Sequence, residues 1–406
     1  MQLQVQAEGL EKDQEIAPRV WTPAFVKIFV VNMLAQYCFY TTNTLSAPYA
    51  DHLGATATVV GLVSGLFGVT ALIFKFVSAP AIDAFSRKKV LIVSLSILLA
   101  SCVGYAVSQT IVTLSISRLL TGVGLAFVPT CCITMASDVL PSKRMSEGIG
   151  FFALGTAICQ AIAPAAGLKA ANLFGYNGAF MILVVLMILT IGFAFNIKVS
   201  FTPINKFKIR LSSIFAKEVL VPTIILFLLN MAFCIVNAFL ILYGRHQGID
   251  SSQIGYFFTV LAITLIFSRP MIGRMADKYG TVRVIVGSMS CFAASFLLIS
   301  YSKTLPLFLI AAFICAFGYA GCHPSLMAVC LKSVPKERRG AASCTSYIGQ
   351  DIGNLAGPVL AGAIIEHLGY VNMWRAMILP IVVATCIAIV FRTQVDHEAE
   401  KTTAPA

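Results

Sequence analysis

The sequence predicts an all-α membrane protein with twelve transmembrane helices in two six-helix pseudo-repeats. Of its 406 residues, 58% are hydrophobic and only 11% are charged, whereas about a quarter of an average soluble domain is charged. Apolar runs of about 20 residues, the length that crosses a bilayer, begin near residues 23, 57, 88, 112, 147, 178, 220, 252, 282, 305, 341 and 371. The two halves of the chain also match each other.

This internal match holds at one offset of 194 positions, without a gap. Lys75 is likewise matched by another cation, Arg269. The identical pairs are Asn43 and Asn237, Tyr49 and Tyr243, Gly54 and Gly248, Gly61 and Gly255, Asp83 and Asp277, Gly124 and Gly318, Pro141 and Pro335, Arg144 and Arg338, Pro164 and Pro358, Gly175 and Gly369, and Tyr176 and Tyr370. The repeat demands equal halves, and so it favours six spans in each.

The repeat and the polar stretches give the expected organisation of the chain. The first 20 residues carry four acids and no apolar core, which excludes a signal peptide or a span there. We expect a mobile cytoplasmic tail at 1–20, a first bundle at 21–199, a cytoplasmic linker at 200–219, a second bundle at 220–391 and a cytoplasmic tail at 392–406.

The net charge of +12 is distributed unevenly over the predicted loops. If both termini lie on one side, that side holds 22 of the 29 Lys and Arg residues, the other side holds four, and Lys75, Arg118 and Arg269 lie inside spans. This bias follows the positive-inside rule and argues against nucleic-acid binding. It predicts a multi-pass protein of the cytoplasmic (inner) membrane with both termini in the cytoplasm.

The first span carries a polar stripe at i, i+4, i+8 and i+11, the spacing of one helix face. Lipid does not tolerate such a face, so it lines a cavity or a bundle interior, or else it forms hydrogen bonds between helices. The stripe consists of Asn32, Gln36, Tyr40 and Asn43, and the seventh span repeats it with Asn230 and Asn237.

Charged and titratable residues inside spans are candidates for function, because burying them is costly. Arg118 has Ala312 as its counterpart in the repeat, so its charge is not an architectural feature of both halves. Asp351 is the one carboxylate well inside a predicted span, on a stripe with Tyr347, Asn354 and Pro358. His323, one turn after Tyr319, is either a packing residue or a ligand for substrate or proton.

The remaining reactive residue types give no catalytic pattern. The twelve cysteines fall mostly within spans and show no CxxC or Cys/His ligand spacing, which favours a role as small apolar fillers. There is no Ser/His/Asp set, phosphate loop or metal cluster in the sequence. We therefore expect no enzyme activity, no metal and no cofactor.

Two motifs make the chain resemble the major facilitator superfamily, specifically bacterial twelve-helix proton-coupled efflux transporters of the drug-antiporter type. The turn motif after the second helix is intact in the second half as Gly273, Asp277, Lys278 and Gly280, whereas the first half keeps only Asp83 and the cations that follow it. The helix-four motif is matched by Leu114, Arg118, Gly122 and Gly124. The helix-five motif, with Gly150, Pro164 and Gly167, is partial.

The resemblance implies a secondary active transporter that works by alternating access, as a functional monomer that exports a small organic substrate in exchange for protons. Uptake of a small organic anion is the alternative, and a transporter-like sensor is a further one. The gating residues would be Asp83, Asp277, Arg269, Gly273, Lys278 and Gly280. The substrate-binding candidates are Arg118, Gln36, Tyr40, Asn43, Asn230, Asn237, Tyr319, His323, Tyr347 and Asn354.

Asp351 and Lys75 are the candidates for proton coupling. At about 1.5 Å of rise per residue, Lys75 lies about 12 Å from the end of its span and Asp351 about 15 Å from the start of its own. Residues at such similar depths can meet in one conformation if the second and eleventh helices pack together, as they do in the resembled family. Protonation of Asp351 would then accompany separation of the halves; a fixed structural ion pair is the alternative.

Overall fold

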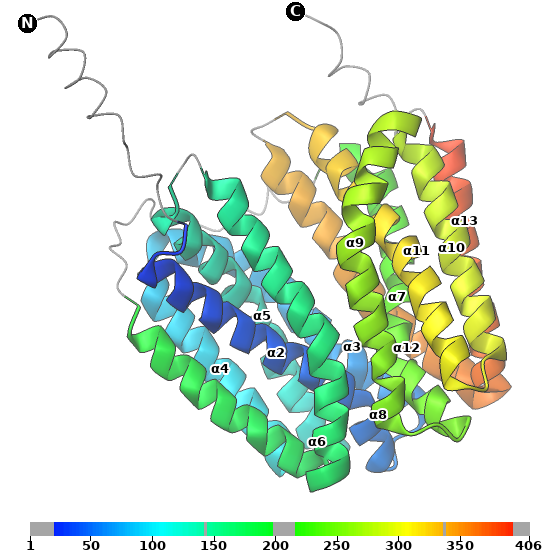
Figure 1. Ribbon diagram of the computed structural model, residues 1–406, viewed down its shortest axis with the longest axis horizontal. Coiled ribbons are helices and arrows are strands. Elements are labelled where there is room, and N and C mark those ends of the chain that lie inside the picture. Colours follow the sequence, from blue (N-terminus) through cyan, green and yellow to red (C-terminus); the bar gives the residue numbers. More distant parts are fainter. Residues whose placement is uncertain (1–19, 142–143, 198–215, 336–337, 393–406) are drawn as a thin grey trace, which may run out of the picture.

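The computed structural model describes residues 20–141, 144–197, 216–335 and 338–392, and these residues form helices and no strand (Figure 1). The expected tails and linker fall almost wholly outside the described residues. The helices are α2 (Pro23–His52), α3 (Ala57–Ala84), α4 (Arg87–Val107), α5 (Ile111–Val139), α6 (Met145–Phe195), η3 (Lys217–Val219), α7 (Leu220–His246), α8 (Ser251–Ile254), α9 (Tyr256–Tyr279), α10 (Thr281–Tyr301), α11 (Leu305–Lys332), α12 (Arg339–Ala376) and α13 (Ile378–Val390). The described chain starts before α2 and stops after α13 at the same end of the molecule, which we call the end with the termini.

Ten helical stretches of the described chain are long and apolar enough to cross a membrane, where the sequence led us to expect twelve spans. The difference arises because α6 runs through both the fifth and the sixth expected spans, and the stretch Ala341–Val390 runs through the last two. Both contain a glycine with a non-helical backbone, Gly175 at φ 71° and Gly369 at φ 78°. Each long stretch therefore consists of two helical segments joined at a glycine.

Local sequence explains where several helices begin and end. Thr22 accepts a backbone N–H at the start of α2, and Pro23 occupies the first turn, where no donor is needed. Thr110 and Thr113 form a capping box at the start of α5. Gly280, at φ 91°, ends α9 in a conformation that favours glycine.

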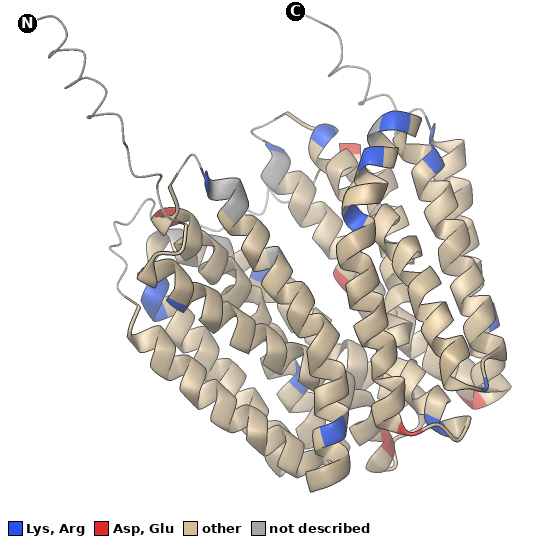
Figure 2. Ribbon diagram, viewed as in Figure 1, with Lys and Arg blue, Asp and Glu red and all other residues tan. Residues whose placement is uncertain are grey.

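The outer surface of the bundle is apolar. Phe267 is 74% exposed and Val390 is 72% exposed, and many other large hydrophobic side chains lie on the outside. Figure 2 shows few charged residues along the middle of the helices. Such a surface exceeds what soluble monomers expose and fits the hydrocarbon core of a bilayer.

The helices form a first half (α2–α6) and a second half (η3–α13), which meet where α3 packs on α12 and α6 packs on α9. Small residues allow this close approach. A Cβ added to Gly61 would lie 2.0 Å from the carbonyl oxygen of Pro358, and one added to Gly362 would lie 2.3 Å from that of Ala57. The contacts lie toward the end of the molecule away from the termini (Figure 1).

Candidate functional site

A cavity of about 610 Å³ lies between the two halves, and α2, α3, α5 and α6 line it from one side and α7, α9, α11 and α12 from the other. Its size suits a drug-sized molecule. The lining residues are Gln36, Phe39, Tyr40, Asn43, Ser64, Phe67, Lys75, Leu125, Pro129, Thr156, Gln160, Asn230, Phe233, Cys234, Asn237, Ala238, Arg269, Tyr319, His323, Tyr347, Gln350, Asn354 and Pro358. Nine of the ten expected substrate-binding residues are among them.

Three of the four residues in the polar stripe of α2 face this cavity, whereas Asn32 is buried and is not part of its lining. Gln36, Tyr40 and Asn43 line it, and Asn237 lines it from α7. Asn230 also lies at the cavity wall, where its side-chain amide donates 2.9 Å to the carbonyl of Leu226 in its own helix. The polar residues that the repeat duplicates thus line one shared cavity from both halves. This arrangement agrees with the interpretation of the stripe as cavity-lining rather than as hydrogen bonding between helices.

Arg118, the tenth expected residue, lies behind the cavity wall. Its side chain is fully buried, and Nη2 donates to Asn43 Oδ1 at 2.9 Å and to the carbonyl of Ser64 at 2.7 Å. Nε donates 3.2 Å to the carbonyl of Val63, and the guanidinium lies 4.8 Å from the centre of the Phe67 ring. Arg118 therefore reaches the cavity through Asn43, which it holds in place, and its charge is balanced by uncharged oxygens and a ring face.

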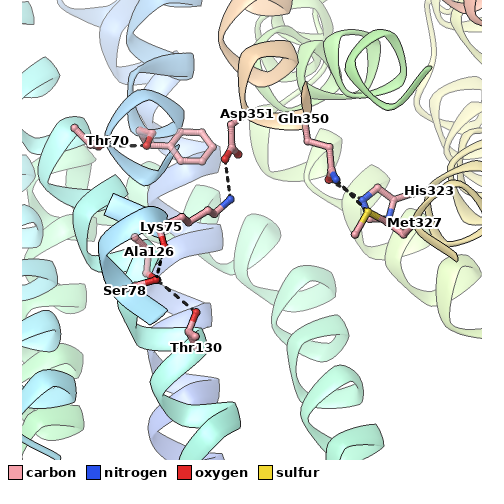
Figure 3. Close-up of polar contacts among 10 residues, drawn as sticks. Thr70, Lys75, Ser78, Ala126, Thr130, His323, Met327, Gln350 and Asp351 are labelled. Atoms are coloured by element: carbon pink, nitrogen blue, oxygen red, sulfur yellow. Dashed lines mark hydrogen bonds and ion pairs between the residues drawn. The ribbon is translucent and has the colours of Figure 1, made fainter. Parts of the chain in front are cut away.

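Lys75 and Asp351 join the two halves at the cavity (Figure 3). Lys75 Nζ lies 2.8 Å from Asp351 Oδ2, and the Asp351 side chain is 8% exposed against 35% for Lys75. Lys75 Nζ also lies 4.9 Å from the centre of the Tyr347 ring. The expected contact between these two residues is present; its role in proton coupling stays a prediction.

His323 belongs to a polar chain on the α11 side of the cavity. Its Nε2 lies 2.9 Å from Gln350 Oε1, and because an amide oxygen only accepts, Nε2 donates. Gln350 in turn donates to Met327 Sδ at 3.4 Å, and both contacts are drawn in Figure 3. The ring of Tyr319 lies 3.8 Å from that of Phe233 and 5.4 Å from that of His323. Gln350 and Phe233 were not among the expected residues, although Gln350 directly precedes Asp351.

The expected gating residues separate into two places. Arg269 lines the cavity, whereas Gly273, Lys278 and Gly280 lie at the end of α9 with the turn. Lys278 Nζ lies 5.2 Å from the ring centre of Tyr279, and Gly273 has open space around it. The side chains of Asp83 and Asp277 lie outside the described residues.

Polar contacts between the halves also occur at the end of the molecule away from the termini, and no sequence pattern indicated them. Glu366 in α12 accepts the backbone N–H of Thr58 at 3.0 Å and so caps the start of α3. Asn172 in α6 donates to Asp250 Oδ2 at 3.3 Å. The pKa of Asp250 is held below its usual value, chiefly by the hydrogen bond that its carboxylate accepts from the Ser252 hydroxyl.

Within one half, Arg87 pairs with Asp138 across α4 and α5, and Arg338 pairs with Glu218. Among the described residues, no group of three or more His, Cys, Asp or Glu is arranged to hold a metal ion. The described site is therefore an amphipathic cavity with aromatic walls, several amides and phenols, one ion pair that bridges the halves, and one further arginine.

The described architecture is shared with solved transporters. A crystal structure of the nucleoside transporter NupG superposes with a TM-score of 0.74 at 15% identity, covering 91% of this chain and 100% of that one. A POT family transporter in complex with 5-aminolevulinic acid gives a TM-score of 0.77 at 14% identity, covering 91% of this chain and 96% of the other. At these identities the likeness shows the fold alone.

Sequence relatives cover most of the chain. An uncharacterized MFS-type transporter of Methanocaldococcus jannaschii is 25% identical over 88% of this chain and 92% of its own length. The staphylopine export protein of Staphylococcus aureus is 25% identical over 86% and 91%, and a multi-drug resistance efflux pump PmrA homolog of Lactococcus lactis is 24% identical over 82% and 87%. The Major Facilitator Superfamily model matches residues 28–247 and 223–406. The chain therefore belongs to the Major Facilitator Superfamily of membrane transporters.

Proposed function

We propose that this transporter exports a small organic molecule across the cytoplasmic membrane in exchange for protons, by alternating access of the cavity between its halves. The observation that carries the proposal is the Lys75–Asp351 ion pair, which joins the two halves beside that cavity. A carboxylate in this position can respond to a proton and to the relative position of the halves at once. In this proposal the chain crosses the membrane twelve times, with both termini in the cytoplasm.

The contacts between the halves support assignment of the described conformation as inward-facing. Thr58 with Glu366, Asn172 with Asp250, and the backbone contact at Gly61 all lie toward the end away from the termini. With the termini in the cytoplasm, that end faces outward and is closed. Opening it requires all three contacts to break, and closing the other end would then involve the turns that contain Asp83 and Asp277.

Proton coupling follows from the charge of Asp351. When Asp351 is ionised, the attraction to Lys75 holds α3 against α12; a proton on the carboxylate removes that attraction and leaves a neutral acid, which separates from Lys75 at lower cost. In the proposed cycle a proton binds from outside when the halves are apart there and is released to the cytoplasm as the ion pair re-forms. Arg118 and Asn43 shape the cavity wall in this cycle and carry no proton.

Export is favoured over uptake because two of the relatives bear the names of an export protein and an efflux pump. Uptake of an organic anion remains the second candidate, since the cavity contains Arg269 and Lys75 against a single carboxylate. The two directions are distinguished by the sign of the gradient that drives accumulation. A sensor without flux would move substrate under neither gradient.

The test is transport in proteoliposomes under an imposed pH gradient, with organic cations and anions screened in both directions. Asp351→Asn mimics the protonated acid, so gradient-driven accumulation should be lost while substrate exchange at equal pH continues. The control is Glu218→Gln, which breaks an exposed ion pair inside one half, where such pairs contribute about 1 kcal/mol or less. Full gradient-driven accumulation by Asp351→Asn would remove Asp351 as the coupling residue.

A further inference from the structure

Arg269 is the one cation of the cavity wall that has no partner within the described part of the chain. Lys75 is neutralised by Asp351 at 2.8 Å, and Arg118 is buried behind the wall. Arg269 lines the cavity and makes neither an ion pair nor a hydrogen bond with any described residue. Arg269 is exposed in the cavity, so its guanidinium is open to a ligand, and charged residues that face a cavity between membrane helices mark substrate or ion pathways.

The internal repeat explains why this charge is unpaired. Arg269 is the counterpart of Lys75, and at the same offset of 194 the counterpart of Asp351 is Ala157 in α6. The second carboxylate is thus missing from the sequence, whereas the cation that it would neutralise is retained.

The helix contacts place these counterparts in the same register. On one side, Gly61 of α3 lies against Pro358 of α12. On the other, Gly255, which directly precedes α9, lies against Ala165 of α6, one residue from the counterpart of Pro358. Farther along α9, Thr259 Oγ1 donates 2.7 Å to the carbonyl of Ala161. Ala157 lies one helical turn from Ala161 on α6. It is the counterpart of Asp351, the residue that pairs with Lys75 on the other side.

The surroundings of Arg269 suit an anionic group. Tyr40, Tyr319 and His323 line the same cavity as Arg269. The phenol hydroxyls can donate to an anion beside the planar guanidinium, whose paired N–H groups match the two oxygens of a carboxylate or a similar acid. Because Tyr40 belongs to the first half and Arg269 to the second, one bound anion would touch both halves.

The rest of the cavity suits an apolar body with a ring. Phe39 and Phe67 meet edge to face at 5.7 Å from one half, and Phe233 stacks on Tyr319 at 3.8 Å from the other. These side chains line the same cavity as Arg269. We infer that the substrates of this transporter are amphipathic organic anions, whose acidic group binds Arg269 and whose ring-containing body lies against these aromatic walls. This inference rests on the proposed transport function and names its substrate class.

Binding to the full-length protein in nanodiscs tests the inference with three probes that share one fluorophore: dansylglycine (anionic), dansylamide (neutral) and dansylcadaverine (cationic). The wild type should bind dansylglycine most tightly. Arg269→Gln should weaken dansylglycine about tenfold to a hundredfold, the range for a charge-assisted hydrogen bond, and should leave dansylamide within about twofold. Arg269→Lys keeps the charge but loses the paired donors, so its affinity for dansylglycine should lie between those of the wild type and Arg269→Gln.

A second variant leaves Arg269 in place. Ala157→Asp restores the missing carboxylate, so it should neutralise Arg269 internally and weaken dansylglycine as Arg269→Gln does, whereas the uncharged Ala157→Asn should not. Arg375→Gln, which removes an exposed arginine that contacts the ring of Tyr301 outside the cavity, is the control for net charge. Melting temperatures establish that each variant is folded.

Three results would overturn the inference: dansylcadaverine bound as tightly as dansylglycine, equal weakening of all three probes by Arg269→Gln, or no binding of dansylglycine at millimolar concentration. Transport is measured separately in proteoliposomes. If dansylglycine binds in an Arg269-dependent way but is not moved by a pH gradient, the proposed proton-coupled export fails while the anion site stands.

Discussion

Replacing Gly61 with alanine tests whether the contact between α3 and α12 controls the conformation of the transporter. The added Cβ would lie 2.0 Å from the carbonyl oxygen of Pro358, about 1.4 Å closer than the 3.4 Å at which ordinary van der Waals contact begins. That neighbour is backbone and cannot rotate away, so the two halves must separate locally. Overpacking of this kind costs about 1–3 kcal/mol, and the cost falls only on the conformation in which these helices touch.

The population ratio of the two conformations should therefore shift by about 5- to 150-fold toward the state in which this end is open. Spin labels at Leu173 and Leu368, exposed residues near the contact end, report the shift as a longer distance in a cysteine-depleted background. Gly287→Ala is the matched control, because a Cβ there meets nothing within 4 Å and should stabilise α10 by about 0.5–1 kcal/mol. An unchanged label distance and full transport by Gly61→Ala would refute the reasoning.

Three further variants test single contacts. Glu366→Gln weakens the cap on α3 that Glu366 provides through Thr58, so the same labels should show a smaller shift toward the open end, of about 0.5–1 kcal/mol; no shift would mean that the cap does not hold the halves. The pKa of Asp250 is held below its usual 3.8, so the stabilisation by its carboxylate is complete above pH 3.8 and is lost as the pH falls through the lowered pKa. The difference in melting temperature between wild type and Asp250→Asn should therefore shrink from pH 6 to pH 3. A constant difference would contradict this. Gly175→Ala meets no atom within 4 Å but forces φ 71° on an L-residue, so it should lower stability to chemical denaturation by about 1–3 kcal/mol, whereas an unchanged stability would show that α6 can straighten there.

Much of the cavity could be predicted because helical periodicity and the repeat act together. The spacing of Gln36, Tyr40 and Asn43 places them on one face, and the offset of 194 finds Asn237 independently. Each such residue lines the cavity. The meeting of Lys75 and Asp351 could be anticipated from two things together: their similar depths, measured from the ends of their helices, and the packing of the second helix on the eleventh that the family resemblance implied.

What could not be predicted depends on contacts that periodicity does not encode. Glu366 and Thr58 are 308 residues apart, and no pattern in either helix fixes their register. Arg118 was expected to touch substrate because a charge inside a span signals function, but its depth did not reveal that Asn43 would lie between it and the cavity. The expected spans at 147 and 178 follow each other in α6 without an intervening loop, because Gly175, at a positive φ, redirects the chain between the two helical segments.

The two proposals together determine how the membrane potential would act on transport. The repeat has one cation neutralised by its own carboxylate, Lys75 with Asp351, and one that lacks it, Arg269 opposite Ala157. If the first pair takes up a proton and the second binds a substrate anion, one cycle carries a positive charge inward and a negative charge outward. Both movements are downhill in an inside-negative membrane, at about 2.3 kcal/mol per charge for each 100 mV. Because Arg269 is retained without its carboxylate, a position that could hold an ion pair becomes a site for a substrate anion, and the export of that anion is driven by the membrane potential as well as by the pH gradient. A cationic substrate would gain nothing from the potential and would be repelled by the same arginine.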